Sequence, residues 1–203
     1  MNKNKPIKVI LLGESGVGKT NIIKRFKYNE FNESSSSTKG ASYNSITLDI
    51  PYLERSIICD IYDMGGHEKY HSLSKAIYKG AKIVILVYDI TNEYSFKSIK
   101  NYWYNEVKLN SVVDPMFVVV ANKIDLSENQ KVNIKDGKEF ADKIGAIFQS
   151  TSALSNSGIS TLFDNIGKTY LLPEYDYKVD DIKTFMERRR RYSLLNLIKY
   201  INK

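Results

Sequence analysis

The chain is poor in cysteine and lacks a long apolar run, and these two shortages exclude two classes of protein. Cys59 is the only cysteine among 203 residues, so no internal disulfide can form and a reducing, intracellular compartment is expected. No stretch approaches the ~18 consecutive apolar residues that a membrane-spanning helix needs. The short apolar run at 7–12 is followed by no cleavage site for a signal peptidase, so we expect it to be a buried strand.

Net charge is also scarce outside the last part of the chain. The chain carries 30 basic and 23 acidic residues, a formal net charge of +7. Residues 183–203 hold seven of the basic residues and one of the acidic residues, so residues 1–182 are close to neutral. A nucleic-acid-binding domain would carry its positive charge on the folded part, so no nucleic-acid partner is expected.

Strand-like and helix-like patterns alternate along the chain, which is typical of an α/β fold with a mostly parallel sheet. The apolar runs at 82–88 and 116–121 resemble central parallel strands, as the run at 7–12 does. Alternating patterns at 42–50 and 56–62 predict an antiparallel hairpin at one edge of the sheet. Apolar stripes at helical spacing predict helices at 20–28, from Phe96 to Val107 and from Ile159 to Tyr170.

Residues 13–20, Gly-Glu-Ser-Gly-Val-Gly-Lys-Thr, match the P-loop pattern between a predicted strand and a predicted helix. The glycines let successive backbone N–H groups point at phosphate oxygens, and the following helix adds its positive end. Lys19 is expected to reach the β- and γ-phosphates, and the Thr20 hydroxyl to bind Mg²⁺. An accidental glycine-rich turn is the alternative, which this context disfavours. The predicted phosphate-binding residues are Ser15, Gly16, Val17, Gly18, Lys19 and Thr20.

A P-loop alone does not identify the base, because ATP-dependent enzymes such as kinases share it. Asn122-Lys123-Ile124-Asp125 follows the predicted strand at 116–121. A carboxylate at Asp125 can accept two hydrogen bonds from the N1–H and exocyclic amine of guanine, a pattern that adenine cannot supply. An unpaired buried carboxylate is costly, so such a site rejects adenine. The motif therefore favours guanine over the kinase alternative.

Asp63 and Thr38 are the predicted partners of Thr20 in a magnesium site. Asp63-Met64-Gly65-Gly66 follows the strand at 56–62, where the carboxylate could hold Mg²⁺ through water and the Gly66 N–H could meet the γ-phosphate. Thr38 lies in a long polar loop, where its hydroxyl could complete the metal shell only while a γ-phosphate is present. Two loops tied to one phosphate relax when it leaves, which is the physical basis of a switch. The alternative is that these are ordinary turn residues.

Taken in order, residues 13–20, Thr38, 63–66, 122–125 and Thr151-Ser152-Ala153 resemble the five nucleotide-binding motifs of Ras-superfamily GTPases. The segments around these motifs, at 70–73, 78–81 and 86–93, are most similar to the early-endosomal branch of the Rab family. The resemblance covers residues 5–172. It implies a P-loop NTPase fold with a six-stranded, mostly parallel sheet and helices on both faces.

The resemblance also implies a function: a GTP/GDP switch with Mg²⁺ that hydrolyses GTP and works in intracellular vesicle trafficking. Its partners would be a guanine nucleotide exchange factor, a GTPase-activating protein and effector proteins. The base-binding residues it implies are Asn122, Lys123, Asp125, Ser152 and Ala153.

The residue after the DxxG motif departs from the pattern of most Rab and Ras proteins. His67 stands where they have the glutamine that orients the attacking water. Sar-type GTPases and translation factors carry a histidine there and still hydrolyse GTP. We therefore expect slow hydrolysis that depends on an activating protein, with Lys19, Gly66 and His67 as the catalytic residues. The alternative is a pseudo-GTPase that holds nucleotide and recruits partners with negligible hydrolysis.

Four other positions depart from the same pattern. Ser34 stands where an aromatic residue usually covers the nucleotide, and Lys39 replaces an isoleucine that helps to read effectors. Tyr62 replaces a tryptophan in the effector patch, and Leu154 replaces the lysine that stacks on the base. These changes predict a flexible first switch, an unfamiliar set of effectors and a lower nucleotide affinity.

Residues 173–203 form a predicted C-terminal extension. Arg188–Arg191 precede apolar residues at helical spacing, which predicts a basic amphipathic helix within 183–203. The last four residues hold no cysteine for prenylation. Three uses stay open for the helix: an anionic membrane surface, the chain's own domain or another protein. The expected location is cytoplasmic, and peripheral on endomembranes if the first of these uses applies.

Overall fold

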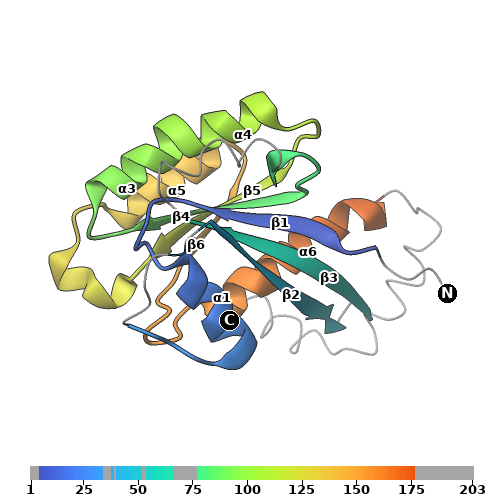
Figure 1. The fold of residues 1–203 in the computed structure, drawn as a ribbon, viewed down its shortest axis with the longest axis horizontal. Coiled ribbons are helices and arrows are strands. Elements are labelled where there is room, and N and C mark those ends of the chain that lie inside the picture. The colour runs from blue at the N-terminus through green and yellow to red at the C-terminus, as the bar shows by residue number, and fades with distance from the viewer. Residues whose placement is uncertain (1–4, 34–37, 39, 52–53, 66–76, 177–203) are drawn as a thin grey trace.

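A twisted sheet lies between two layers of helices in the computed structural model (Figure 1). The model describes residues 5–33, 38, 40–51, 54–65 and 77–176. The sheet has six strands in the order β2-β3-β1-β4-β5-β6. Only β2 runs antiparallel to its neighbour, and the other pairs are parallel. The prediction of a six-stranded, mostly parallel sheet with helices on both faces is confirmed.

The strands form where the sequence is apolar or alternating. In chain order they are β1 (Ile7–Leu12), β2 (Ala41–Ile50), β3 (Arg55–Met64), β4 (Ile83–Asp89), β5 (Met116–Asn122) and β6 (Ile147–Ser150). The predicted hairpin is present, with Ile46 opposite Cys59. Every residue of β4 is buried, as expected for a strand covered by helices on both faces.

The helices lie between the strands in the chain, except α6, which follows the last strand. They are α1 (Lys19–Tyr28), α3 (Glu93–Ser98), the π-helical turn η3 (Ile99–Trp103), α4 (Tyr104–Asn110), the 3₁₀ turn η4 (Ile124–Asn129), α5 (Ile134–Lys143) and α6 (Ile159–Asp176). Of the helices that the structure describes, none combines the length and apolarity needed to cross a membrane.

Two hydrophobic cores occupy the two faces of the sheet, because successive strand residues point to opposite sides. Val9 and Leu11 of β1 belong to the core beneath α1 and α6, whereas Ile10 and Leu12 belong to the core beneath α3, α4 and α5. Figure 1 shows these helix layers on opposite sides of the sheet.

The helix predicted from Phe96 to Val107 differs in detail from the observed one. The apolar residues of the stripe are buried, as expected: Phe96, Ile99, Trp103 and Val107. The middle of the helix, however, widens into the π-helical turn η3. Trp103 ends this turn, and its indole Nε1 donates to a carboxylate oxygen of Glu14 at 3.3 Å. The widened turn thus lies where the helix meets the loop after β1.

The fold gathers the functional motifs at one edge of the sheet. Parallel strands end at the same edge, and Asp63, Asp89 and Asn122 stand at or near the carboxyl ends of β3, β4 and β5. The loop after β1 enters α1 at this edge, between β3 and β4 in the sheet order. Open α/β sheets usually bind ligands at this carboxyl edge, where the strand order reverses.

Candidate functional site

A cavity of about 330 Å³ opens at the carboxyl edge of the sheet. Most of the predicted site residues line it, from the loop after β1 to the loop after β6. Those lining it are Ser15, Gly16, Gly18, Lys19, Thr20, Thr38, Asn122, Lys123, Asp125 and Ala153. Val17, Asp63 and Ser152 do not line the cavity, but each is hydrogen-bonded to a residue that does.

The loop between β1 and α1 curls around the ammonium group of Lys19. Lys19 Nζ donates to the carbonyls of Gly13 at 2.7 Å and Glu14 at 2.8 Å, and the side chain is almost fully buried. Gly18, at φ 99°, turns the chain into α1, and a Cβ there would collide with the side-chain amide of Asn122. The loop therefore needs glycine at this position both for its backbone conformation and for space.

Burial lowers the pKa of Lys19 to about 8, and the carboxylates of Asp63 and Glu14 oppose that shift. Desolvation disfavours the charged ammonium, whereas a nearby negative charge favours it. Lys19 is therefore a desolvated cation at the cavity wall, suited to pair with an anion there.

Thr20, Thr38 and Asp63 meet close to Lys19. Thr20 Oγ1 donates to Asp63 Oδ2 and shares a hydrogen bond of 2.9 Å with Thr38 Oγ1. Asp63 Oδ1 is buried and has no hydrogen-bond partner among the described residues. Burial raises the pKa of Asp63, which the Thr20 hydroxyl and the Lys19 ammonium oppose. Mg²⁺ prefers oxygen ligands and typically takes one or two carboxylates with substrate phosphates, so this oxygen set fits it.

The two loops expected to act as switches touch at their described ends. The Gly65 N–H donates to the Gly40 carbonyl at 2.7 Å, and a Cβ on Gly65 would collide with the Thr38 carbonyl. Gly66 and His67, the predicted γ-phosphate and water-orienting residues, lie outside the described residues, as do Ser34, Lys39 and 183–203.

The Asn122 side chain links two of the loops that line the cavity. Its side-chain Nδ2 donates to the Val17 carbonyl at 2.8 Å, and its Oδ1 accepts from the Thr151 hydroxyl at 3.0 Å. The Asn122 side chain is buried, so both bonds are shielded from water. One side chain thus joins the loop between β1 and α1 (residues 13–18, the phosphate loop) to the loop after β6.

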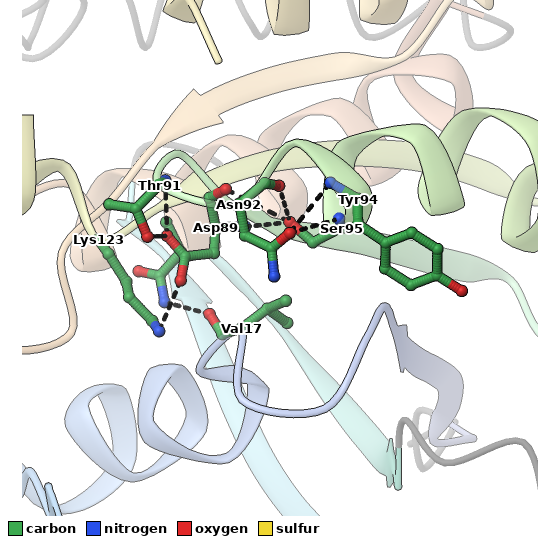
Figure 2. Close-up of polar contacts among 8 residues, drawn as sticks. Val17, Asp89, Thr91, Asn92, Tyr94, Ser95 and Lys123 are labelled. Carbon is green, nitrogen blue, oxygen red and sulfur yellow. Dashed lines mark hydrogen bonds and ion pairs between the residues drawn. The ribbon is translucent and has the colours of Figure 1, made fainter. Parts of the chain in front are cut away.

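Lys123 and Asp125 adopt different positions after β5. Lys123 has a left-handed backbone, with φ 66°, and its Nζ lies 2.7 Å from Asp89 Oδ2 (Figure 2). Asp89 Oδ1 accepts from the backbone N–H and the hydroxyl of Thr91, each at 2.8 Å. Asp125 Oδ1 accepts from the Ser152 hydroxyl, and its Oδ2 has no partner among the described residues.

Several residues of the site were not predicted from the sequence. Phe31 and Leu126 also line the cavity, and they add apolar surface to it. Phe31 stands three residues before Ser34, so the first switch loop does offer an aromatic side chain to the cavity. A signal was present, since Phe31 is an isolated apolar residue in a polar segment. Arg25 contacts the loop after β6 through backbone carbonyls, and the residue types of that loop gave no signal for this.

Comparison with known proteins decides the family. A family model described as the Ras family matches residues 8–172. The chain belongs to the Ras family. This match covers β1 to most of α6 and includes every described residue of the cavity.

Several proteins similar to this chain are Rab proteins. Ras-related protein Rab-31 of Homo sapiens is 38% identical over 162 residues, which cover 80% of this chain and 82% of that protein. Ras-related protein Rab-11B of Dictyostelium discoideum is 36% identical over 159 residues, covering 78% of this chain and 71% of that protein. Ras-related protein RABA5a of Arabidopsis thaliana is 36% identical over 161 residues, covering 79% and 72%. The predicted resemblance to the Rab family is confirmed.

Membership of the Ras family indicates which ligands the cavity of this Rab-like protein should be compared with. Ras-family GTPases bind GTP or GDP together with Mg²⁺, and membership supports GTPase activity. The cavity has a cationic and oxygen-rich end at Lys19, Thr20 and Asp63. The Asp125 carboxylate and the apolar side chains of Phe31 and Leu126 line the cavity as well.

Proposed function

We propose that this Rab-like protein binds GTP and GDP with Mg²⁺ in the cavity and hydrolyses GTP slowly, with the help of an activating protein. The observation that carries the proposal is the pairing of two chemistries in one cavity. Lys19, Thr20 and Asp63 are suited to a phosphate–metal group, and Asp125 with Ala153 is suited to a purine edge.

At the base end, Asp125 would accept from the N1–H and exocyclic amine of guanine. Ser152 supports this role by donating its hydroxyl to Asp125 Oδ1, which fixes the orientation of the carboxylate. The Ala153 N–H would donate to the guanine oxygen. Adenine would leave the carboxylate without these donors, at a cost of about 1–3 kcal/mol or more.

At the phosphate end, Lys19 would bind the β- and γ-phosphate oxygens, and Thr20, Thr38 and Asp63 would hold Mg²⁺. Bound there, the metal would neutralise charge that develops on the phosphate oxygens. Gly66 would donate its N–H to the γ-phosphate, and His67 would orient the attacking water. A histidine in place of the usual glutamine is the reason to expect slow intrinsic hydrolysis.

The exposed face of β2 and β3 is the candidate surface for effectors. Tyr43 is exposed, lies edge-on to Tyr62 at 5.5 Å, and donates its hydroxyl to Asp60 at 2.8 Å. Lys8 Nζ lies 5.2 Å from the centre of the Tyr62 ring. This surface adjoins both switch loops, so an effector bound there would sense their state. The Rab relatives support a role in vesicle trafficking, with an exchange factor and an activating protein as regulators.

The nucleotide that copurifies with the protein, followed by single-turnover hydrolysis, tests this function. We expect GDP and GTP in the extract, no ATP or ADP, and slow conversion of GTP to GDP. His67→Gln should raise the hydrolysis rate, whereas His71→Gln, the matched change at the other histidine, should leave it within about twofold. Bound GTP that stays intact for hours would instead support the pseudo-GTPase.

We further propose that residues 183–203 attach the protein peripherally to anionic endomembranes. Each basic residue near such a surface contributes about 1 kcal/mol. Flotation with vesicles that contain phosphatidylserine should recover the full chain but not residues 1–182, and neutral vesicles should recover neither. Equal flotation of both proteins would contradict the proposal.

A further inference from the structure

Arg25 of α1 lies outside the phosphate loop, yet its guanidinium contacts two segments that lead to lining residues of the cavity: the end of α1, just before Phe31, and the loop that carries Ala153. Its Nε donates to the Ala153 carbonyl at 2.8 Å, and its Nη2 donates to the Leu154 carbonyl at 3.1 Å. Its Nη1 donates to the carbonyl of Asn29 at 2.8 Å and to the side-chain Oδ1 of Asn29 at 3.1 Å. Asn156 Nδ2 donates to the same Oδ1 at 3.3 Å.

The loop that Arg25 holds, residues 151–157, is called here the base loop. Internal bonds shape it: the Ser152 N–H donates to the Ser157 carbonyl at 2.9 Å, and the Ser155 N–H donates to Ser152 Oγ at 3.0 Å. These bonds close the loop on itself. The bonds from Arg25 instead fix it to α1, the helix that begins at the phosphate loop.

The second segment leads to the aromatic wall of the cavity. Asn29 ends α1 with a left-handed backbone, at φ 55°, and Phe31 follows two residues later. Asn21 holds the chain just beyond, because its Nδ2 donates to the Asn32 carbonyl at 3.0 Å. Arg25 therefore joins the segment that carries Phe31 to the loop that carries Ala153.

We propose that Arg25 is a positioning residue for the purine: it fixes the base loop so that the Ala153 N–H faces the guanine oxygen, and it thereby sets how slowly the nucleotide leaves. This inference rests on the proposed binding of guanine nucleotide. Ala153 lines the cavity, and among the described residues no acceptor takes its N–H. The Ala153 carbonyl, bonded to Arg25, fixes the orientation of the residue that carries this N–H.

A lysine cannot replace this arginine. The planar guanidinium donates in several directions at once to oxygens of Ala153, Leu154 and Asn29, whereas an ammonium on a flexible stem cannot hold the same geometry. Leu154 makes this anchor more important. Its side chain is 53% exposed, and the bond it offers to α1 is through its backbone.

The dissociation of ribose-labelled fluorescent GDP from the full chain tests the proposal with Arg25→Ala and Arg25→Lys. Both variants should release GDP at least about tenfold faster, because hydrogen bonds from a charged donor are lost. Lys27→Ala is the matched control, since it removes a positive charge from the exposed face of the same helix turn, where the Lys27 ammonium lies 5.0 Å from the centre of the Tyr28 ring. Its release rate should stay within about twofold.

A second nucleotide separates positioning from a general loss of stability. The diphosphate of 6-thioguanosine keeps both the N1–H and the exocyclic amine of guanine, which the Asp125 carboxylate would accept, but replaces the oxygen with sulfur, a weaker acceptor for the Ala153 N–H. In the wild-type protein it should leave faster than GDP. In the Arg25 variants the two nucleotides should leave at more similar rates, because the donor is no longer held in place.

The outcomes are distinct. Unchanged GDP release in both variants, or faster release with an unchanged ratio between the two nucleotides, overturns the role of Arg25. A wild-type protein that does not hold GDP at all overturns the proposed function before any variant is compared. Thermal unfolding is followed for each protein, and Arg25→Lys, which keeps the charge and most of the side-chain volume, provides the measurement if Arg25→Ala does not fold.

Discussion

Removing the side chain of Asn122 is the sharpest test of how the cavity is held together. Asn122→Ala deletes the donor to the Val17 carbonyl and the acceptor for the Thr151 hydroxyl, at 2.8 and 3.0 Å. Val17 and Thr151 are both buried, with 1% and 0% of their surface exposed. Their polar groups therefore lose a partner where water reaches them poorly.

Each buried polar group left without a partner costs about 1–3 kcal/mol. Two such groups give an expected loss of about 3 kcal/mol in the free energy of unfolding, a large fraction of the 5–15 kcal/mol typical of a domain. In thermal unfolding this loss corresponds to a decrease in Tm of roughly 6–12 °C for a chain of this size. Asn122→Asp should cost a similar amount, because its carboxylate accepts from Thr151 but cannot donate to Val17 and brings a buried negative charge up to the Val17 carbonyl oxygen.

Urea denaturation at a series of GDP concentrations measures the effect. A nucleotide that binds only the folded state stabilises it by a term that grows with its concentration, so the series separates lost affinity from lost intrinsic stability. Asn101→Ala removes the same side chain from an exposed position and should change stability by no more than about 0.5 kcal/mol. The reasoning is refuted if Asn122→Ala is no more destabilising than this control.

Three further predictions follow from the geometry. Gly18→Ala should weaken GDP binding at least about a hundredfold in a fluorescence titration, because the added Cβ collides with Asn122 in a backbone at φ 99°. Gly16→Ala meets similar backbone strain at φ 79° but has open space around its Cβ, so it should weaken binding less. Burial raises the pKa of Cys59 to about 12, so at pH 8 the folded protein should not react with a disulfide reagent, whereas the urea-unfolded protein should. Chelating Mg²⁺ should accelerate GDP release at least about tenfold in the wild type and far less in Asp63→Ala, and equal acceleration would remove Asp63 from the metal site.

The sequence was informative where a residue follows a strand. Parallel strands end at one edge, so Asp63 and Asn122 could be expected to lie near the phosphate loop from the order of strands alone. The same reasoning did not locate β6 or α5, because the short strand Ile147–Ser150 is only partly buried and has no apolar run. The π-helical turn was also missed, since a stripe at 96, 99, 103 and 107 is compatible with a regular helix.

Contacts to backbone carbonyls were the other part that could not be predicted. Asn122 bonds to Val17 across 105 positions of sequence, and Arg25 bonds to Ala153 across 128. Every residue type has a carbonyl, so nothing in the residue types at Val17 or Ala153 indicates that a distant side chain donates to it. Such contacts become visible only when the fold brings the segments together.

Contacts made through the backbone also bear on the positions where this chain departs from the Rab pattern, because they do not depend on the side chain at the position. Leu154 stands where a lysine is expected to stack on the base. The base loop is nevertheless anchored to Arg25 through the backbone carbonyls of residues 153 and 154, which any side chain at position 154 would leave in place. Phe31 lines the cavity from the loop in which Ser34 replaces the usual aromatic residue. Among the described residues, the backbone of residues 153 and 154 and the side chain of Phe31 therefore shape the cavity at these two places. The substitution at His67 is different, because the role proposed for that residue, orienting a water molecule, belongs to its side chain. Leu154→Lys should consequently alter the rate of GDP release much less than Arg25→Ala does. The reverse order would show that the side chain at position 154, and not the backbone anchor, governs retention of the nucleotide.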